Sequence, residues 1–265
     1  LSIGIVNNRS NPGYKIAWII LILFLPIFGS VIYVILGTFY MPKKVRVALS
    51  NAESNVRRYL SKDMKSLDFI ENVDMPVANQ LRYLQSFVGC PVYKDTGSDF
   101  LSPGEVKFEV MKKELLKAEK FIFLEYFIVS NGRMWQEVFD ILIEKAKSGI
   151  EIRLMYDDFG SLMTLPYKYE RYLSQYGIKS CVFGKLVPIW SVLINNRDHR
   201  KILVVDGKVG ITGGINIADE YINDYEKHGY WKDSSVIIRG ESVWSLTVFF
   251  LSSWGYVNGV NEDYT

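Results

Sequence analysis

The sequence is poor in residues that bind metals or form disulfides. Its 265 residues include only two cysteines and two histidines. Cys90 and Cys181 lie far apart and form no C-x-x-C pattern, so we expect two reduced thiols rather than a disulfide framework or a zinc cluster. The histidines form no H-E-x-x-H motif, which argues against a zinc hydrolase. We therefore expect a site that uses neither a metal nor another cofactor.

The chain also lacks a strong overall charge. Its formal net charge is +2 at pH 7, which argues against a dedicated nucleic-acid binder, because such domains concentrate positive charge. Hydrophobic residues make up 49% of the chain and charged residues 23%, as in ordinary folded proteins. The length suffices for one sizeable domain, or for one domain and an anchor.

One long stretch lacks charge altogether. No charged residue lies between Lys15 and Lys43, and residues 16–40 are almost wholly apolar. In a helix, roughly 20 such residues cross a hydrocarbon core of about 30 Å. The stretch predicts a transmembrane helix at about 16–40, within a membrane anchor formed by residues 1–42. A cleaved signal peptide is the alternative, but it requires a shorter apolar core and a small-residue cleavage site.

Residues 43–90 are expected to form a basic, helical juxtamembrane linker. Seven lysines and arginines fall between residues 43 and 65, opposed only by Glu53 and Asp63. Basic residues near a membrane attract anionic lipid headgroups, by about 1 kcal/mol per charge; a merely solvated helix explains them equally well. The basic excess after the apolar stretch favours a cytoplasmic location for the rest of the chain.

The remaining residues, 91–265, alternate between helical and strand patterns. This alternation predicts an α/β sheet covered by helices on both faces. Asp157 and Asp158 follow the second strand, at the carboxyl end where such folds place their sites. They either contact a substrate or catalytic group, or cap a helix. Strands are expected over 121–129, 150–156, 178–183, 202–205 and 235–239, and helices over 103–120, 134–147, 165–176 and 242–254.

The strongest chemical signal begins at His199. His199 and Lys201 are two residues apart, so on a strand both side chains point to the same face. An apolar run, residues 202–205, follows them. Asp206 and Gly207 then form a turn signal between two strand-like runs, which predicts a hairpin.

These residue types suit phosphate-ester chemistry. Imidazole can attack phosphorus and leave again, and its pKa near neutrality also suits proton transfer. Lys201 offers a compact positive charge to the non-bridging oxygens. Gly213 and Gly214 allow close backbone approach, and Asn216 adds an uncharged amide donor.

At these positions the sequence resembles the phospholipase D superfamily, whose signature is H-x-K-x4-D followed by x6-G-[SG]-x-N. The wider context is similar to the bacterial cardiolipin synthase family. The residues that match the signature are His199, Lys201, Asp206, Gly213, Gly214 and Asn216. Further matching segments are 26–29, 124–126, 157–161, 213–221 and 231–233.

The resemblance implies a mixed sheet flanked by helices and a reaction on phospholipid. A histidine would take the phosphatidyl group from phosphatidylglycerol, forming a phosphohistidine, and a second phosphatidylglycerol would accept it to give cardiolipin. It makes His199 the nucleophile or the acid, and it assigns phosphate binding to Lys201 and Asn216 with the adjacent glycines. Asp206 is expected to orient or charge a histidine. The implied partners are anionic phospholipid and the bacterial cell membrane, with the catalytic domain in the cytoplasm and no nucleic acid.

The sequence departs from the family in holding a single motif. His228, the other histidine, has Tyr230 where the motif needs lysine, so we expect a surface residue. The chain begins with Leu1 rather than Met, and we expect the N-terminal half of a longer enzyme, completed by a second motif from a C-terminal half or from a homodimer partner. The alternatives are a phospholipase D-like phosphodiesterase or nuclease acting as a homodimer, and an inactive, truncated membrane-anchored module.

Overall fold

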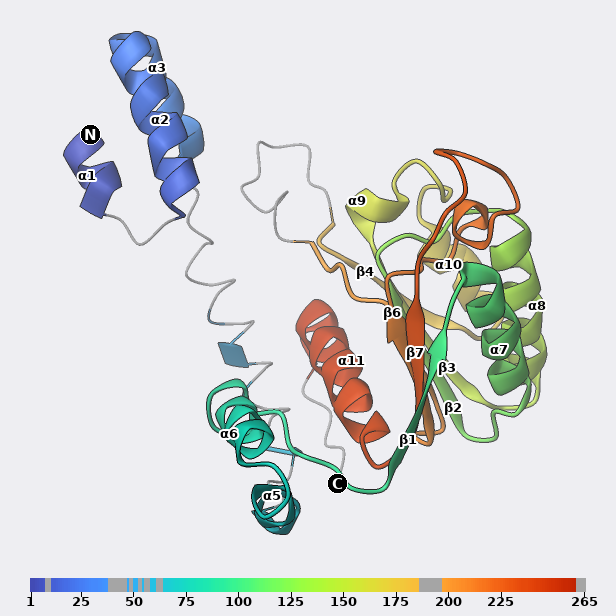
Figure 1. Cartoon of the computed structure of the whole chain (residues 1–265). Coiled ribbons are helices and arrows are strands. Elements are labelled where there is room, and N and C mark those ends of the chain that lie inside the picture. The colour runs from blue at the N-terminus through green and yellow to red at the C-terminus, as the bar shows by residue number, and fades with distance from the viewer. Residues whose placement is uncertain are drawn as a thin grey trace.

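The computed structural model describes residues 1–7, 11–37, 64–185 and 197–260, together with 47, 50, 51, 54 and 58–60. Figure 1 shows short N-terminal helices, two linker helices and a mixed α/β domain.

The N-terminal apolar stretch is divided rather than continuous. Helix α2 (Pro12–Phe24) ends at Leu25, whose φ of −130° is not helical, and Pro26 begins α3 (Pro26–Ile32). Proline cannot donate a backbone hydrogen bond and disfavours the α conformation in the residue before it, which explains the break. The expected single helix over 16–40 is therefore interrupted, and its last three residues lie outside the described part. No helix among the described residues has both the length and the apolar character that a membrane span requires.

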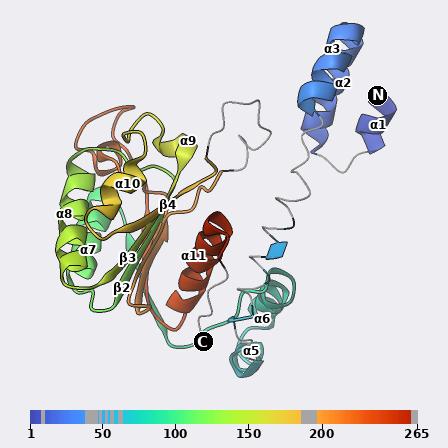
Figure 2. The same ribbon diagram turned by 180° about the vertical axis from the view of Figure 1, so that it is seen from behind.

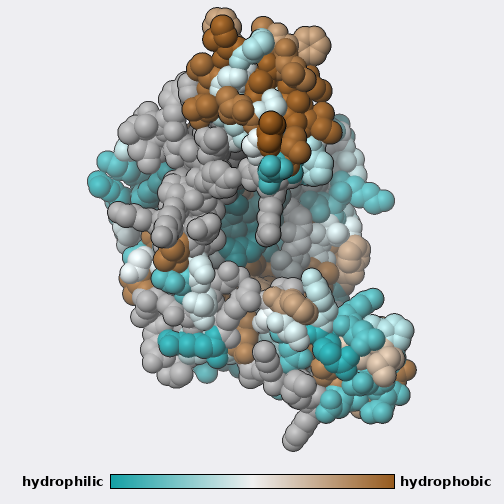
Figure 3. Space-filling model, turned by 90° about the vertical axis from the view of Figure 1, so that its left-hand side faces the viewer, coloured by the Kyte–Doolittle hydropathy of each residue, from teal (hydrophilic) through white to brown (hydrophobic). Residues whose placement is uncertain are grey.

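The two arms of this stretch lie side by side as a helical hairpin. The Tyr14 hydroxyl donates a hydrogen bond to the Gly37 carbonyl at 3.1 Å, and the Trp18 and Tyr33 rings are 5.3 Å apart. Figure 3 shows apolar side chains gathered over these helices. A short helix, α1 (Ser2–Asn7), precedes the hairpin, and a π-helix (Tyr33–Gly37) follows α3. Exposed apolar residues on the surface of the α2–α3 hairpin include Ile16, Ile20, Leu23, Phe24, Ile27 and Phe28.

The described part of the linker is helical. Helix α5 (Met64–Glu71) is followed by α6 (Met75–Tyr83) and a π-helix (Leu84–Val88). Asp74 caps α6 by accepting a hydrogen bond from the Val77 amide at 3.1 Å. Most of the basic residues of the linker lie outside the described residues.

The domain is built on a seven-stranded mixed sheet with the order β1-β7-β6-β5-β2-β3-β4. Strands β2, β3 and β4 are parallel, and the other neighbours are antiparallel. Strand β1 was not predicted, because this edge strand is mostly exposed and lacks an apolar pattern. The strands are β1 (Thr96–Leu101), β2 (Phe121–Tyr126), β3 (Glu151–Asp157), β4 (Lys179–Phe183), β5 (Ile202–Val205), β6 (Val209–Gly213) and β7 (Ser235–Gly240).

Helices cover both faces of the sheet, as predicted (Figures 1 and 2). Alternate residues of β2 divide between the two cores: Ile122 and Leu124 join the core under α7 and α8, whereas Phe123 stacks on Phe250 of α11 at 4.7 Å. The expected helix over 165–176 shrinks to α10. The helices are α7 (Gly104–Leu116), α8 (Arg133–Lys147), α9 (Asp158–Ser161), α10 (Tyr169–Ser174) and α11 (Val243–Asn258).

Candidate active site

His199 and Lys201 lie immediately before β5, at the sheet edge where β2 and β3 end. Strand β5 runs antiparallel to β2, with Ile202 opposite Glu125. Both side chains meet Phe127, which follows β2: its ring lies 4.7 Å from the His199 ring and 5.3 Å from Lys201 Nζ. The predicted shared face is therefore confirmed, and imidazole and ammonium converge on one aromatic platform.

Lys201 is a partly desolvated cation. Its side chain is buried, and Nζ donates a hydrogen bond to the His199 carbonyl at 2.5 Å. Burial lowers the pKa of Lys201 to about 8, although the charges of Asp198 and Asp233 act in the opposite direction. An ammonium with little water around it interacts more strongly with an anionic oxygen than a fully hydrated one does.

Asp157 holds the backbone that leads into the site. Its buried carboxylate accepts hydrogen bonds from the amides of Phe159 and Gly160, which caps α9, and from the amide of Asp198 at 3.1 Å. Burial raises its pKa, against the effect of these donors. The prediction of helix capping is therefore confirmed for Asp157, whose contact near the site is with the backbone of Asp198 rather than with His199 or Lys201.

The residues that alternate with His199 and Lys201 point to the opposite face of the strand. Arg200 Nε lies 2.9 Å from carboxylate oxygens of both Asp198 and Glu125, and its guanidinium also donates to Ser253 of α11. Burial, together with a hydrogen bond to Asp198, raises the pKa of Glu125 well above its usual range. The Asp198 pKa is lowered, because its bonds to Glu125 and Arg200 outweigh the effect of burial. These opposite shifts favour the neutral form of Glu125 and the charged form of Asp198.

Asp206 lies at the far end of β5 from His199. It forms the predicted turn with Gly207, both with positive φ, between β5 and β6. Its carboxylate accepts three backbone hydrogen bonds of 2.8–2.9 Å from residues 119–121, at the start of β2. These donors lower its pKa, although burial acts to raise it. Asp206 therefore does not contact His199 as expected. It holds the start of β2 instead, at the opposite end of the strands from His199.

Gly213 and Gly214 allow the close approach expected of them. A Cβ on Gly213 would lie 2.5 Å from the Ser234 carbonyl oxygen, and one on Gly214 would lie 2.2 Å from an Asp233 carboxylate oxygen. Asn216 is buried: its oxygen accepts from the Ile128 amide, and its amide group donates to the Tyr221 hydroxyl. Asn216 therefore ties the segment after β2 to the segment after β6, which leaves one N–H for any phosphate.

Two further groups near the site carried no independent sequence signal. The Asp233 carboxylate packs against Gly214 and acts electrostatically on Lys201. Lys107 of α7 is fully buried; its Nζ donates to the Tyr126 hydroxyl at 3.3 Å, and burial lowers its pKa to about 7 against the charge of Asp233. In the sequence, Lys107 is one of several lysines in a helix pattern and resembles a solvated residue.

The other expected features have simple placements. His228 is exposed, as predicted, with its ring 6.5 Å from that of Trp231. Within the described residues, no group of three or more histidine, cysteine or acidic side chains could hold a metal ion.

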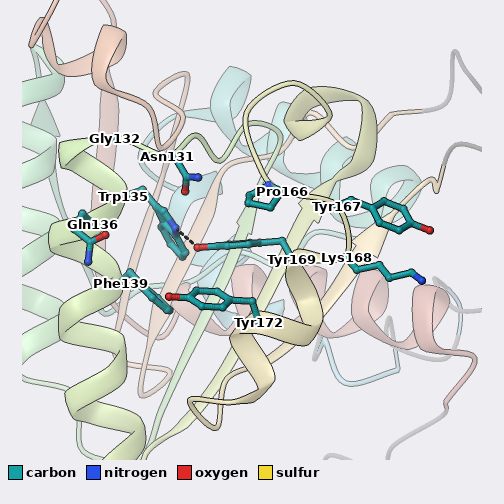
Figure 4. A pocket seen from close by; sticks show the side chains of 10 residues that line it. All are labelled: Asn131, Gly132, Trp135, Gln136, Phe139, Pro166, Tyr167, Lys168, Tyr169 and Tyr172. Atoms are coloured by element: carbon teal, nitrogen blue, oxygen red, sulfur yellow. Dashed lines mark hydrogen bonds between the residues drawn. The ribbon is translucent and has the colours of Figure 1, made fainter.

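An aromatic pocket of about 370 Å³ lies between α8 and the segment before α10. Figure 4 shows the Trp135 indole turned toward the Tyr169 hydroxyl, with which it forms a 2.8 Å hydrogen bond. Tyr167 and Lys168 point away from the pocket in the same view.

Comparisons with known proteins agree with the motif. Residues 111–238 match the family model "Cardiolipin synthase, PLD-like domain", and residues 1–37 match "Phospholipase_D-nuclease N-terminal". The chain is 36% identical to a cardiolipin synthase of Geobacillus thermodenitrificans, over 96% of this chain and 50% of that protein. It is 31% identical to one of Oceanobacillus iheyensis, over 100% of this chain and 57% of that protein. The chain thus spans about half the length of these curated relatives.

A solved structure, the phospholipase D family member Nuc from Salmonella typhimurium, aligns with a TM-score of 0.47 and 15% identity, over 61% of this chain and 96% of that one.

Proposed function

We propose that this chain, a member of the phospholipase D superfamily, supplies one half of a phosphatidyltransferase site that joins two phosphatidylglycerol molecules into cardiolipin and glycerol. The observation that carries the proposal is the convergence of His199 and Lys201 on the Phe127 ring. The similarity to cardiolipin synthases supports phospholipid as the substrate.

The proposed reaction has two displacements at phosphorus. An imidazole nitrogen of His199 attacks the phosphatidyl phosphorus, and the bond from phosphorus to the glycerol headgroup breaks as an acid protonates the leaving oxygen. A hydroxyl of a second phosphatidylglycerol then attacks the phosphohistidine, loses its proton to a base, and releases the imidazole. Lys201 stabilises the negative charge on the non-bridging oxygens, and the remaining N–H of Asn216 adds a neutral donor.

The acid and base role falls to a second histidine. We infer that this histidine comes from a second motif, in a C-terminal half or a second copy of the chain, because His228 lacks the partnering lysine and lies on the surface. His199 and the second histidine exchange the nucleophile and acid roles in this proposal.

The N-terminal residues 1–42 are proposed to anchor the protein to the bacterial cell membrane, with the basic linker and the domain of residues 91–265 on the cytoplasmic side. The exposed apolar surface of the α2–α3 hairpin supports this anchor, since an apolar patch of this kind marks a site of interaction.

The test is lipid analysis by mass spectrometry in bacteria that make no cardiolipin. The chain is expressed alone and together with the C-terminal half of the Geobacillus thermodenitrificans relative, each with native His199 and with His199→Ala. We expect cardiolipin when the chain with native His199 is expressed together with the C-terminal half, and none when it carries His199→Ala. Cardiolipin that persists in the His199→Ala pair contradicts the assignment of this histidine. Release of phosphatidic acid without cardiolipin indicates a phosphodiesterase instead.

A further inference from the structure

The segment between β3 and α10 has an inverted distribution of polar and apolar side chains. Ser161 is 2% exposed, whereas Met163 is 92% and Tyr167 is 88% exposed. Phe159 and Leu162 are also more than half exposed. A loop that faces water normally buries its large apolar residues and exposes its hydroxyls, so this loop is built for a different neighbour.

The polar side chains of this loop hold it in place. The Ser161 hydroxyl accepts a hydrogen bond from the Val129 amide at 3.1 Å, and the Thr164 hydroxyl donates to the Val129 carbonyl at 2.7 Å. Below the loop, Trp135 and Tyr169 form the hydrogen-bonded wall of the pocket in Figure 4. The apolar side chains therefore project from an anchored backbone.

The loop adjoins the active site. The Phe159 ring lies 5.6 Å from the Arg197 guanidinium, two residues from His199. A Cβ on Gly160 would lie 2.1 Å from the carbonyl oxygen of Phe127, the residue whose ring packs on His199. Whatever covers the apolar loop thus lies beside the reacting histidine.

We propose that Phe159, Leu162, Met163 and Tyr167 insert into the surface of a lipid bilayer and seat the His199 edge of the sheet on the membrane. The proposal rests on the proposed function in one respect: a phospholipid phosphate lies at the depth at which such a loop would place His199. The segment from Phe159 to Tyr167 carries no charge, and Lys168 follows it with its ammonium 4.9 Å from the Tyr167 ring. Tyrosine and lysine at the rim of an apolar patch suit the interface between acyl chains and anionic headgroups.

The bilayer is favoured over a protein partner by the rest of the chain. The α2–α3 hairpin has its own exposed apolar surface, so the same chain presents apolar side chains both there and on the loop. A bilayer covers both at once. Interfacial segments of this kind bury their apolar side chains about 5–10 Å into the boundary between headgroups and acyl chains.

The test uses the full chain in nanodiscs of phosphatidylglycerol and phosphatidylcholine, with an environment-sensitive fluorophore on Met163→Cys. Cys90→Ser removes the more accessible native thiol. Cys181 remains, because it is buried and burial raises the pKa of its thiol to about 12, which leaves it unreactive. Lys147→Cys is the matched control. Lys147 is also exposed and is the last residue of α8, the helix whose first turns line the pocket below the loop.

We expect lipids with a spin label in the upper acyl chain to quench the probe at position 163, and aqueous iodide to quench it weakly. The control at position 147 should show the reverse. Iodide quenching at 163 as strong as at 147 overturns the proposal, and so does protection from both quenchers, which indicates a second copy or another protein over the loop. The readout needs no turnover, so it stands or fails separately from the transferase assignment. Unchanged circular dichroism of both labelled variants shows that each is folded.

Discussion

The two ends of strand β5 carry opposite kinds of chemistry, although one short motif contains both. At the first end, His199 is exposed, and Lys201 keeps a charge where burial disfavours it. At the other end, Asp206 accepts three backbone hydrogen bonds, which favour its charged form. A charged group whose hydrogen bonds are all made within the protein serves the structure. A charged group that burial disfavours, and that has few partners in the protein, gains more from binding a ligand of opposite charge.

The same division appears across the strand. Arg200 binds Asp198, Glu125 and Ser253 beneath α11, while His199 and Lys201 turn to the other face. The two-residue period of an extended chain therefore alternates anchoring side chains with the candidate catalytic ones. Rigid placement of a reactive pair requires such anchoring of the residues between them.

Replacing His199 should have the largest effect on the rate of any change at either end of β5. His199→Ala is expected to reduce the proposed phosphatidyl transfer by at least about 10³-fold, because the variant lacks the imidazole that is proposed to form the phosphohistidine. Its free energy of unfolding should change little, since the side chain is exposed. Initial rates by mass spectrometry and urea unfolding measure the two effects. His228→Ala is the control, and an equal loss of rate in that variant would contradict the assignment.

Lys201→Met should separate function from stability. Transfer is expected to fall by about 10²–10³-fold, because a charge on the transition-state oxygens loses its partner. The folded-state pKa of about 8 lies below the ordinary value of 10.5, so the unfolded chain binds this proton more tightly. The penalty is therefore fully present below pH 8 and disappears as the pH rises toward 10.5.

At pH 7 the variant should consequently be more stable than the native chain by about 1–2 kcal/mol, after allowance for solvent screening. The difference should vanish near pH 10.5. Unfolding curves at both pH values test this, and a destabilised variant at pH 7 would show that the lysine is structural.

Asp206→Ala should have the converse effect. Three amides lose their acceptor, and we expect the free energy of unfolding to fall by about 2–3 kcal/mol. The rate per folded molecule should stay within about three-fold of the native rate, because these hydrogen bonds lie at the opposite end of the strands from His199. Asp206→Asn keeps one acceptor and tolerates the positive φ, so its loss of stability should be intermediate. A large loss of rate in fully folded Asp206→Asn would restore a catalytic role to this residue.

The sequence predicted the local geometry of the site residues better than it predicted their partners and roles. The shared face of His199 and Lys201, the turn at Asp206 and the close approach at the two glycines all follow from local rules of strand and turn geometry. The partner of Asp206 did not, because its donors lie about 86 residues earlier in the chain and meet it only through β-sheet pairing. Asp233 lies in a segment that matches the family, but its place beside Gly214 was not predicted, and neither was the burial of Lys107, because both depend on the tertiary fold.

The fold shows a similar limit. Buried strands and the long helices α8 and α11 were predicted within a few residues, because their apolar patterns are continuous. Strand β1 was not predicted, because an exposed edge strand needs no alternation of apolar and polar residues. The break in the helix at Leu25 was not predicted, because Pro26 is compatible with both a kinked membrane helix and a turn.

Glu125→Gln should have the smallest effect. Glu125 lies on the anchoring face of β2, and burial raises its pKa well above the usual range, which favours its neutral form. Glutamine has nearly the same size, is neutral and carries an N–H donor, so the free energy of unfolding should change by less than about 1 kcal/mol. An acid with a raised folded-state pKa loses stability as pH rises from its ordinary value to the raised one, so any difference should favour the variant increasingly over that range. Unfolding of both proteins between pH 5 and pH 8 is the measurement. Strong destabilisation of the variant at pH 7 would mean that Glu125 is ionised and that Arg200 is shared by two charged carboxylates.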